Sequence, residues 1–180
     1  MTLAELFTTK DWQTDKGTLH DYINAYYTSE FEDKRESVKN VLEIGVFNGG
    51  SLRLWKEWFK NANITGMDVN MPDFVAQEGI EIIVKDAYSQ EAINEIQDDT
   101  YDYIIDDGPH TLHSMIIAVK KYLPKVKQGG KLIIEDVQDI QWVNILEEVI
   151  DINIASEWNT IDMRSNKGRY DDIIFEIKRK

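Results

Sequence analysis

Acidic side chains cluster at two places in the second half of the sequence. Asp106 and Asp107 follow one apolar run and precede His110, and Glu135 and Asp136 follow another. If the two runs are neighbouring strands of a parallel sheet, the carboxylates of Asp107, Glu135 and Asp136 gather in one small space. Like charges this close destabilise one another unless a cation or protons intervene. A divalent cation with oxygen ligands, such as Mg²⁺, would relieve the repulsion and lower the pKa of a bound hydroxyl.

His110 stands one short turn from this predicted metal site. An imidazole with an ordinary pKa of about 6.5 is suited to accept a proton from such a hydroxyl. We therefore expect His110 and Asp107 to be catalytic. The alternative is that His110 caps a helix or makes a structural hydrogen bond. Solvation at the strand ends would explain any one of the acids, but explains adjacent acids on both strands less well.

A glycine-rich loop follows the first apolar run, with the spacing Glu43-x-Gly45-x-x-x-Gly49-Gly50-Ser51. Glycines let a backbone turn sharply and approach a ligand closely. The spacing is not Gly-x-Gly-x-x-Gly, so it lacks the second glycine of a dinucleotide site, and it has no phosphate-loop lysine. Glu43 suits a cofactor with a sulfonium and an amino group better than a pyrophosphate. A tight turn in any doubly wound protein remains an alternative.

Two further acids end the next two apolar runs. Asp68 could accept both hydroxyls of a ribose, and Asp86 could accept from an adenine amino group. Each alone could be a solvated loop residue. Together with Glu43 they form a pattern at the ends of three successive strands, which favours S-adenosylmethionine over a dinucleotide.

The alternation of short apolar runs with amphipathic stretches predicts the elements that must position these residues. Such alternation favours a parallel sheet with helical crossovers on both faces. In an open sheet of this kind, ligands bind beyond the carboxyl ends of the strands. The predicted strands are 41–46, 64–69, 80–85, 101–106, 131–135, 152–161 and 172–177, and the predicted helices are 51–60, 90–96, 112–123 and 140–150.

The two last strands should pair antiparallel, because the loop 164–168 that joins them contains no predicted helix. We therefore expect an α/β fold: a doubly wound, mostly parallel seven-stranded sheet with an antiparallel C-terminal strand pair. Residues 1–180 are expected to form a single domain, with an α/β core over 41–180. Residues 1–40 are polar, aromatic and partly helical in prediction, and could act as a lid.

The composition narrows the class of partner. The chain has 180 residues, 42% of them hydrophobic, and a net charge of −13 that would repel a nucleic-acid backbone. No apolar run is long enough to cross a bilayer, the N-terminus does not look like a signal peptide, and there is no cysteine. We expect a cytoplasmic protein without nucleic-acid or membrane partners, and the sequence leaves open an assembly of identical subunits.

Four stretches together resemble the class I, metal-dependent macrocin/mycinamicin-type O-methyltransferases and the related rhamnosyl O-methyltransferase and cephalosporin hydroxylase group. They are Thr14–Gly17 with His20 and Tyr22, Leu42–Trp55, Ile104–His110, and Gly129-Gly130 with Ile134–Asp136. The resemblance implies Mg²⁺ held by Asp107, Glu135 and Asp136, with His110 as the general base. It also implies that Asp15 and Lys16 lie near the cofactor or the mouth of the site. Pro109 stands where the family usually has serine, and the best-known members are longer, so the acceptor-binding part transfers least.

We therefore expect a metal-dependent enzyme that moves a methyl group from S-adenosylmethionine to a hydroxyl of a sugar or another small molecule. The expected cofactor-binding residues are Asp15, Lys16, Glu43, Gly45, Phe47, Asn48, Gly49, Ser51, Asp68, Asp86, Ala87 and Asp106. Two alternatives remain: a nicotinamide-dependent oxidoreductase on a similar sheet, and a non-catalytic module that binds S-adenosylmethionine.

Overall fold

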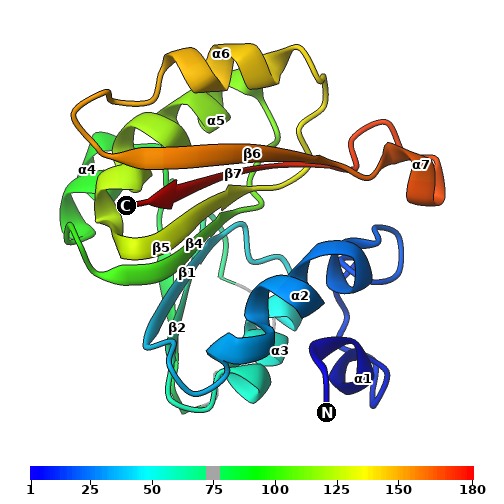
Figure 1. Ribbon diagram of the computed structural model, residues 1–180. Helices are drawn as coiled ribbons and strands as arrows, with labels where there is room; N and C mark the ends of the chain where they lie inside the picture. The colour runs from blue at the N-terminus through cyan, green and yellow to red at the C-terminus, as the bar shows by residue number, and fades with distance from the viewer. Residues whose placement is uncertain (72–77) are drawn as a thin grey trace.

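The structure is a computed structural model that describes residues 1–71 and 78–180, and its centre is a seven-stranded sheet (Figure 1). The strand order is β3-β2-β1-β4-β5-β7-β6. The strands are β1 (Asn40–Ile44), β2 (Asn63–Asp68), β3 (Ile80–Val84), β4 (Tyr101–Asp106), β5 (Val126–Ile134), β6 (Ser156–Asp162) and β7 (Ile173–Arg179). Neighbouring strands from β3 to β5 pair parallel, whereas β7 pairs antiparallel with β5 and β6. The predicted fold class is confirmed.

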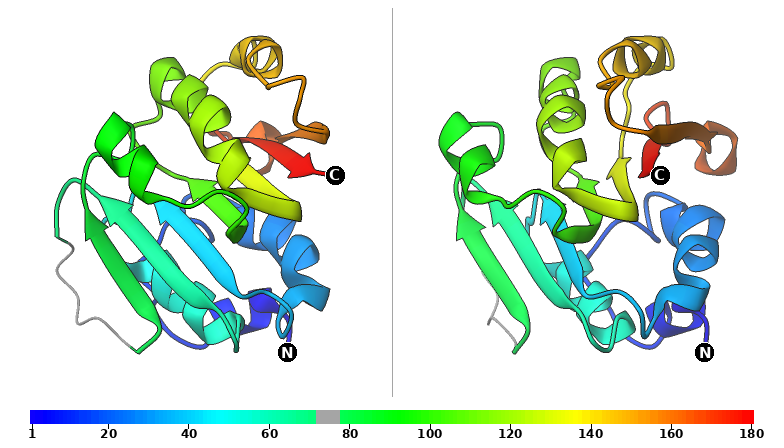
Figure 2. Two further views of the ribbon diagram at one scale, coloured as in Figure 1. Left: turned by 90° about the vertical axis from the view of Figure 1, so that its left-hand side faces the viewer. Right: turned by 60° about the vertical axis from the view of Figure 1, so that its left-hand side comes forward.

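Helices cover both faces of this sheet. Figure 1 shows α2 and α3 on one side and α5 and α6 on the other, and Figure 2 shows the same layers from two further directions. The α-helices are α1 (Leu3–Phe7), α2 (Thr28–Phe31), α3 (Gly50–Trp58), α4 (Gln90–Glu95), α5 (Leu112–Ile117), α6 (Trp142–Glu148) and α7 (Arg164–Lys167). The π-helices are η1 (Ile23–Tyr27) and η3 (Ala118–Tyr122), and the 3₁₀-helices are η2 (Glu32–Lys34) and η4 (Leu123–Lys125).

The alternation of side chains along each strand divides the core into two layers. On β1, Val41 packs in the layer that holds α1, α2 and α3, whereas Leu42 and Ile44 pack in the layer that holds α4, α5 and α6. The central strands are buried on both faces, so their sequences read as continuous apolar runs, as expected for a parallel sheet. Because both faces of these strands are packed, the positions of their carboxyl ends, where the predicted acids lie, are fixed.

The loop between the last two strands differs from the sequence prediction. The loop 164–168 contains one helical turn, α7, which ends at Gly168 with a positive φ of 74°. Glycine takes this left-handed conformation without steric cost and commonly ends a helix. The last two strands still pair antiparallel, because a single turn reverses the chain without crossing the sheet.

The N-terminal 40 residues pack on the sheet face that α3 also covers. Leu3, Ile23, Tyr27 and Phe31 are fully buried in that layer. None of the helices in the described part of the chain is both long and apolar enough to cross a membrane.

Candidate active site

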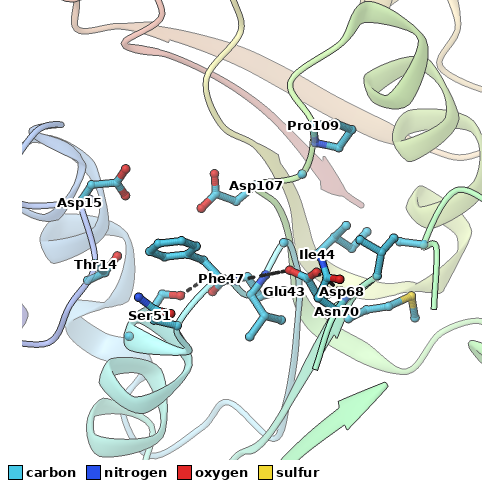
Figure 3. Close-up of a pocket in the computed structure, with 18 of the residues that line it drawn as sticks. Thr14, Asp15, Glu43, Ile44, Phe47, Ser51, Asp68, Asn70, Asp107 and Pro109 are labelled. Atoms are coloured by element: carbon cyan, nitrogen blue, oxygen red, sulfur yellow. Dashed lines mark hydrogen bonds between the residues drawn. The ribbon is translucent and has the colours of Figure 1, made fainter. Parts of the chain in front are cut away.

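A cavity of about 1270 Å³ opens at the carboxyl ends of β1, β2 and β4. Its walls come from the N-terminal segment, from the glycine-rich loop after β1, and from the loops after β2, β3 and β4. Figure 3 shows Thr14 and Asp15 on one side of this space and Asp107 facing them from the loop after β4. Ligand pockets typically measure about 300–1,000 Å³, so the cavity has room for more than one small ligand.

The glycine-rich loop is held close to the loop after β4. Gly45 has a positive φ of 86°, and a Cβ there would lie 1.9 Å from the backbone oxygen of Asp107. The N–H of Gly45 donates to the carbonyl of Met67 at 2.9 Å, and the N–H of Asp107 donates to the carbonyl of Ile44 at 2.9 Å. Glycine is therefore required at position 45, and it brings the first and fourth strand ends together.

The side chains of Glu43 and Asp68 hold the glycine-rich loop through hydrogen bonds. Glu43 is fully buried and accepts from the Ser51 hydroxyl (Figure 3). It also accepts from the Trp55 indole N–H at 2.5 Å. Burial raises the pKa of Glu43. One oxygen of Asp68 accepts from the backbone N–H of Val46 at 2.8 Å and of Phe47 at 3.3 Å. Both acids thus hold the loop in shape while they face the cavity.

Asp86 and Asp106 differ in their surroundings. Asp86 lines the cavity and accepts from the backbone N–H of Tyr88 at 3.0 Å. Asp106 is buried behind it and accepts from the Tyr88 hydroxyl at 2.5 Å. Burial raises the pKa of Asp106 to about 7. Its other oxygen has no hydrogen-bond partner among the described residues.

Lys16 lies among the predicted metal-binding carboxylates. Its side chain is fully buried, and its ammonium donates to Asp107 at 2.6 Å and to Glu135, and lies 3.9 Å from Glu43. Burial lowers the pKa of Lys16, but the charges of Asp107, Glu135 and Glu43 raise it by more, so the net shift is upward. Lys16 therefore neutralises part of the charge that the strand ends gather.

Glu135 and Asp136 face different partners although they are adjacent. Glu135 accepts from Lys16 and from the Tyr27 hydroxyl at 2.5 Å. Asp136 accepts from the Tyr22 hydroxyl and lies 3.8 Å from Nε2 of His110. Burial raises the pKa of both carboxyls.

Asp107, His110 and Asp136 each place one possible ligand atom within 4.8 Å of the ligand atoms of the other two. The two carboxylate oxygens at this spacing suit a divalent cation such as Mg²⁺, with the imidazole of His110 beside them. Glu135 points away from this group toward Lys16 and Tyr27.

His110 is presented by a strained backbone. Its φ is +52°, and Asp136 and Phe47 also have positive φ values, of 53° and 47°. Non-glycine residues in this region cost energy and gather at functional sites. The helix α5 that follows is capped by Thr111, whose side chain accepts from the N–H of Ser114. Because Thr111 is the cap, the ring of His110 is free to face the cavity.

The structure brings together most of the predicted cofactor-binding residues. Those that line the cavity are Asp15, Glu43, Gly45, Phe47, Asn48, Ser51, Asp68, Asp86 and Ala87, together with Asp107 and His110. Lys16, Gly49 and Asp106 do not line it. Lining residues that sequence reasoning did not single out include Gln13, Leu19, Asn70 and Met71. They lie in irregular segments, where no periodic pattern marks a side chain as facing a site.

Comparisons with known proteins identify relatives of this chain. No protein-family model matches the chain. It is 33% identical over 135 residues to the mycinamicin VI 2''-O-methyltransferase of Micromonospora griseorubida. The alignment covers 70% of this chain and 34% of that protein. It is 29% identical over 138 residues to the 8-demethyl-8-alpha-L-rhamnosyl tetracenomycin-C 2'-O-methyltransferase of Streptomyces olivaceus. That alignment covers 72% of this chain and 36% of that protein.

A solved structure also superposes on nearly the whole chain. It is the MycE methyltransferase from the mycinamycin biosynthetic pathway, in complex with Mg, SAH and mycinamycin VI. The TM-score is 0.79 at 25% identity, over 99% of this chain and 54% of that one.

The strand order, the antiparallel last pair and this superposition define the fold of the class I methyltransferases. Within that class, the chain is a relative of the macrocin/mycinamicin-type O-methyltransferases. It spans about a third of the length of the curated relatives named above (34% of the mycinamicin VI enzyme and 36% of the tetracenomycin enzyme).

Proposed function

We propose that the chain is a divalent-cation-dependent methyltransferase that moves a methyl group from S-adenosylmethionine to a hydroxyl of a sugar or another small molecule. The observation that carries the proposal is a single cavity with two chemically different sides. One side holds the glycine-rich loop with Glu43, Asp68 and Asp86, and the other holds Asp107 and His110. The relatives named above are O-methyltransferases, one of a rhamnosyl compound and one of mycinamicin VI, and the superposed structure holds Mg and SAH.

The donor side would hold S-adenosylmethionine, which supplies the methyl group. Glu43, Gly45, Phe47, Asn48 and Ser51 would surround its amino acid part, and Asp68, Asp86 and Ala87 would face its nucleoside. Asp15 would face the same space from the N-terminal segment. Asp68 accepts from the backbone N–H groups of Val46 and Phe47 on Oδ2 and from that of Asn70 at 2.9 Å on Oδ1, so a ribose hydroxyl would use the second lone pair of Oδ1.

The acceptor side would hold the cation through Asp107, Asp136 and Glu135, and a bound cation makes an acceptor hydroxyl more acidic. His110 would then accept the hydroxyl proton at Nε2, which lies 3.9 Å from Asp107 and 3.8 Å from Asp136. These carboxylates stabilise the imidazolium that forms. Glu135, which is bound to Lys16 and Tyr27 in this structure, would be the third carboxylate of that set. Holding donor and acceptor in contact supplies much of the expected acceleration.

Residues 1–40 are proposed to form a cap over this site. Gln13, Thr14 and Asp15 line the cavity, and Lys16, Tyr22 and Tyr27 bind the carboxylates at the ends of β4 and β5. A cap held by such polar contacts can rearrange when the charges of the site change.

The test is a methyl-transfer assay that measures release of S-adenosylhomocysteine with a panel of glycosylated acceptors. We expect turnover with Mg²⁺ that is lost in EDTA and strongly reduced in the variant His110→Ala. Turnover that is unchanged in EDTA would contradict the role of the cation. Binding of S-adenosylmethionine without transfer to any acceptor would favour a non-catalytic module.

A further inference from the structure

A second group of metal-ligating side chains lies on the far side of Asp136 from His110. His20 comes from the N-terminal segment, and Asp171 and Asp172 directly precede β7. One ligand atom from each of the three lies within 4.8 Å of the others. All three are buried, with exposed fractions of 3%, 7% and 0%. None of them lines the main cavity, so the proposed transfer of a methyl group does not account for them.

Each of the two carboxylates in this group has one oxygen without a partner. Oδ1 of Asp172 contacts Nδ1 of His20 at 2.6 Å, and Oδ2 of Asp171 accepts from Arg169 at 3.2 Å. Oδ2 of Asp172 and Oδ1 of Asp171 are buried and accept no hydrogen bond from the described residues. The Nε–H of Arg169, 3.9 Å from Oδ1 of Asp172, is also buried without a partner in the described part of the chain. A buried acceptor without a partner is costly, and a cation between the two carboxylates would satisfy both oxygens.

The charges around His20 are unbalanced in the direction that favours a cation. Besides Asp172, the imidazole faces Asp136 at 3.5 Å and Asp15 at 3.8 Å. Two cations lie nearby: Arg169 is 3.9 Å from Asp172, and the Lys167 ammonium donates to backbone carbonyls, including that of His20 at 3.0 Å. Even with His20 protonated, four carboxylates face three positive charges.

The imidazole is also held in place before any ligand arrives. The ring of Tyr22 stacks on His20 with centroids 4.8 Å apart, and the backbone N–H of His20 donates to the backbone carbonyl of Asp15 at 3.0 Å. The carbonyl of Asp172 accepts from the N–H of Met163 at 2.8 Å. Fixed ligands bind a metal with a smaller entropic penalty.

We propose that His20, Asp171 and Asp172 form a second divalent-cation site that takes Mn²⁺ or Zn²⁺ and fastens the N-terminal segment to the start of β7. An imidazole nitrogen beside two carboxylates suits these ions better than Mg²⁺, which prefers oxygen ligands alone. The cation replaces the proton between Nδ1 of His20 and Oδ1 of Asp172, and this proton passes to solvent. Asp136 lies between the two sites, since its other oxygen faces His110.

The experiment counts Mn²⁺ ions bound to the full chain by electron paramagnetic resonance of the free ion. We expect two bound ions in the wild type, one in Asp107→Asn and one in Asp172→Asn. Asp162→Asn, which removes an exposed acid paired with Arg164, serves as the control and keeps two. If Asp172→Asn does not fold, the site can be tested in Asp107→Asn. We expect the Mn²⁺ bound to that variant to show hyperfine coupling to an imidazole nitrogen, and the coupling should disappear when His20→Gln is added.

The outcomes separate the second site from the first. A wild type that binds a single ion, lost in Asp107→Asn, overturns the second site and leaves the catalytic one intact. Two ions in Asp172→Asn also overturn it. One ion lost only in Asp172→Asn supports the second site and contradicts the cation in the proposed function.

Discussion

Replacing Lys16 by Met tests the electrostatic balance of the site. Lys16 and Glu135 are both 1% exposed, and Asp107 lies 2.6 Å from the ammonium. Removing one partner of a buried ion pair leaves an uncompensated charge and costs about 3–5 kcal/mol. Natural domains are stable by only about 5–15 kcal/mol, so Lys16→Met should lose a large part of its free energy of unfolding. Lys60→Met is the control, because its pair with Glu57 is half exposed and such pairs contribute about 0–1 kcal/mol.

Urea unfolding at pH 7, in EDTA and again with Mg²⁺, measures this effect. In EDTA we expect the full loss for Lys16→Met. With Mg²⁺ the variant should recover part of its stability, because the freed carboxylates of Asp107 and Glu135 bind the cation and ligand binding stabilises the folded state. A free energy of unfolding within about 1 kcal/mol of the wild type in EDTA would refute the reasoning.

Three further predictions follow from particular contacts. His110→Ala should lower turnover by about 10²–10⁴-fold, as expected for loss of a general base, and calorimetry should show unchanged affinity for S-adenosylhomocysteine; unchanged turnover excludes the role. Gly45→Ala should cost more stability in thermal unfolding than Gly129→Ala. Both have positive φ, which costs about 1–2 kcal/mol for other residues, but only Gly45 has a backbone atom 1.9 Å from the added Cβ; equal losses would count against the close approach. Burial raises the pKa of Asp106 to about 7, against about 3.9 in an unfolded chain. This acid therefore favours folding while protonated, and that contribution is lost as pH rises from about 4 to about 7. Denaturant unfolding should show Asp106→Asn gaining on the wild type across this window, by at most about 4 kcal/mol at about 1.4 kcal/mol per unit; a constant difference would show that the carboxyl ionises normally.

The sheet and the strand-end acids could be predicted from the sequence because buried parallel strands read as short apolar runs. The boundaries were less accurate. β5 begins at Val126 rather than 131, because Gly129-Gly130 reads as a turn. The register with β4 shifts between Tyr101 and Tyr103, and a Cβ at Gly130 would lie 2.5 Å from the backbone oxygen of Asp102. A glycine needed for close strand contact looks, in sequence, like a glycine in a loop.

The start of β6 shows a similar difference. The predicted strand began at 152, but β6 begins at Ser156. The carboxylate of Asp151 accepts from the backbone N–H of Asn153 at 2.9 Å. Such an Asx turn competes with strand pairing, and the apolar residues at 152 and 154 concealed it.

The position of Lys16 could not be derived from periodicity. It contacts Asp107 and Glu135, which lie 91 and 119 residues further along the chain. The path of the N-terminal segment over the strand ends depends on packing of irregular structure and of π-helical turns such as η1. The family resemblance placed Lys16 near the site, but only the structure shows it bound to the carboxylates rather than lining the cavity.

Calorimetric titration of the full chain tests the central claim most directly. S-adenosylhomocysteine is titrated in one experiment, and NAD⁺, which represents the alternative class of cofactor, in another. The cavity with Glu43 under the glycine-rich loop predicts one S-adenosylhomocysteine per chain and no heat with NAD⁺, because a carboxylate at that position disfavours a pyrophosphate. The affinity should fall when Asp68, which holds the loop through Val46 and Phe47, is replaced by Ala. Binding of NAD⁺ without binding of S-adenosylhomocysteine would contradict the proposed methyltransferase and favour an oxidoreductase.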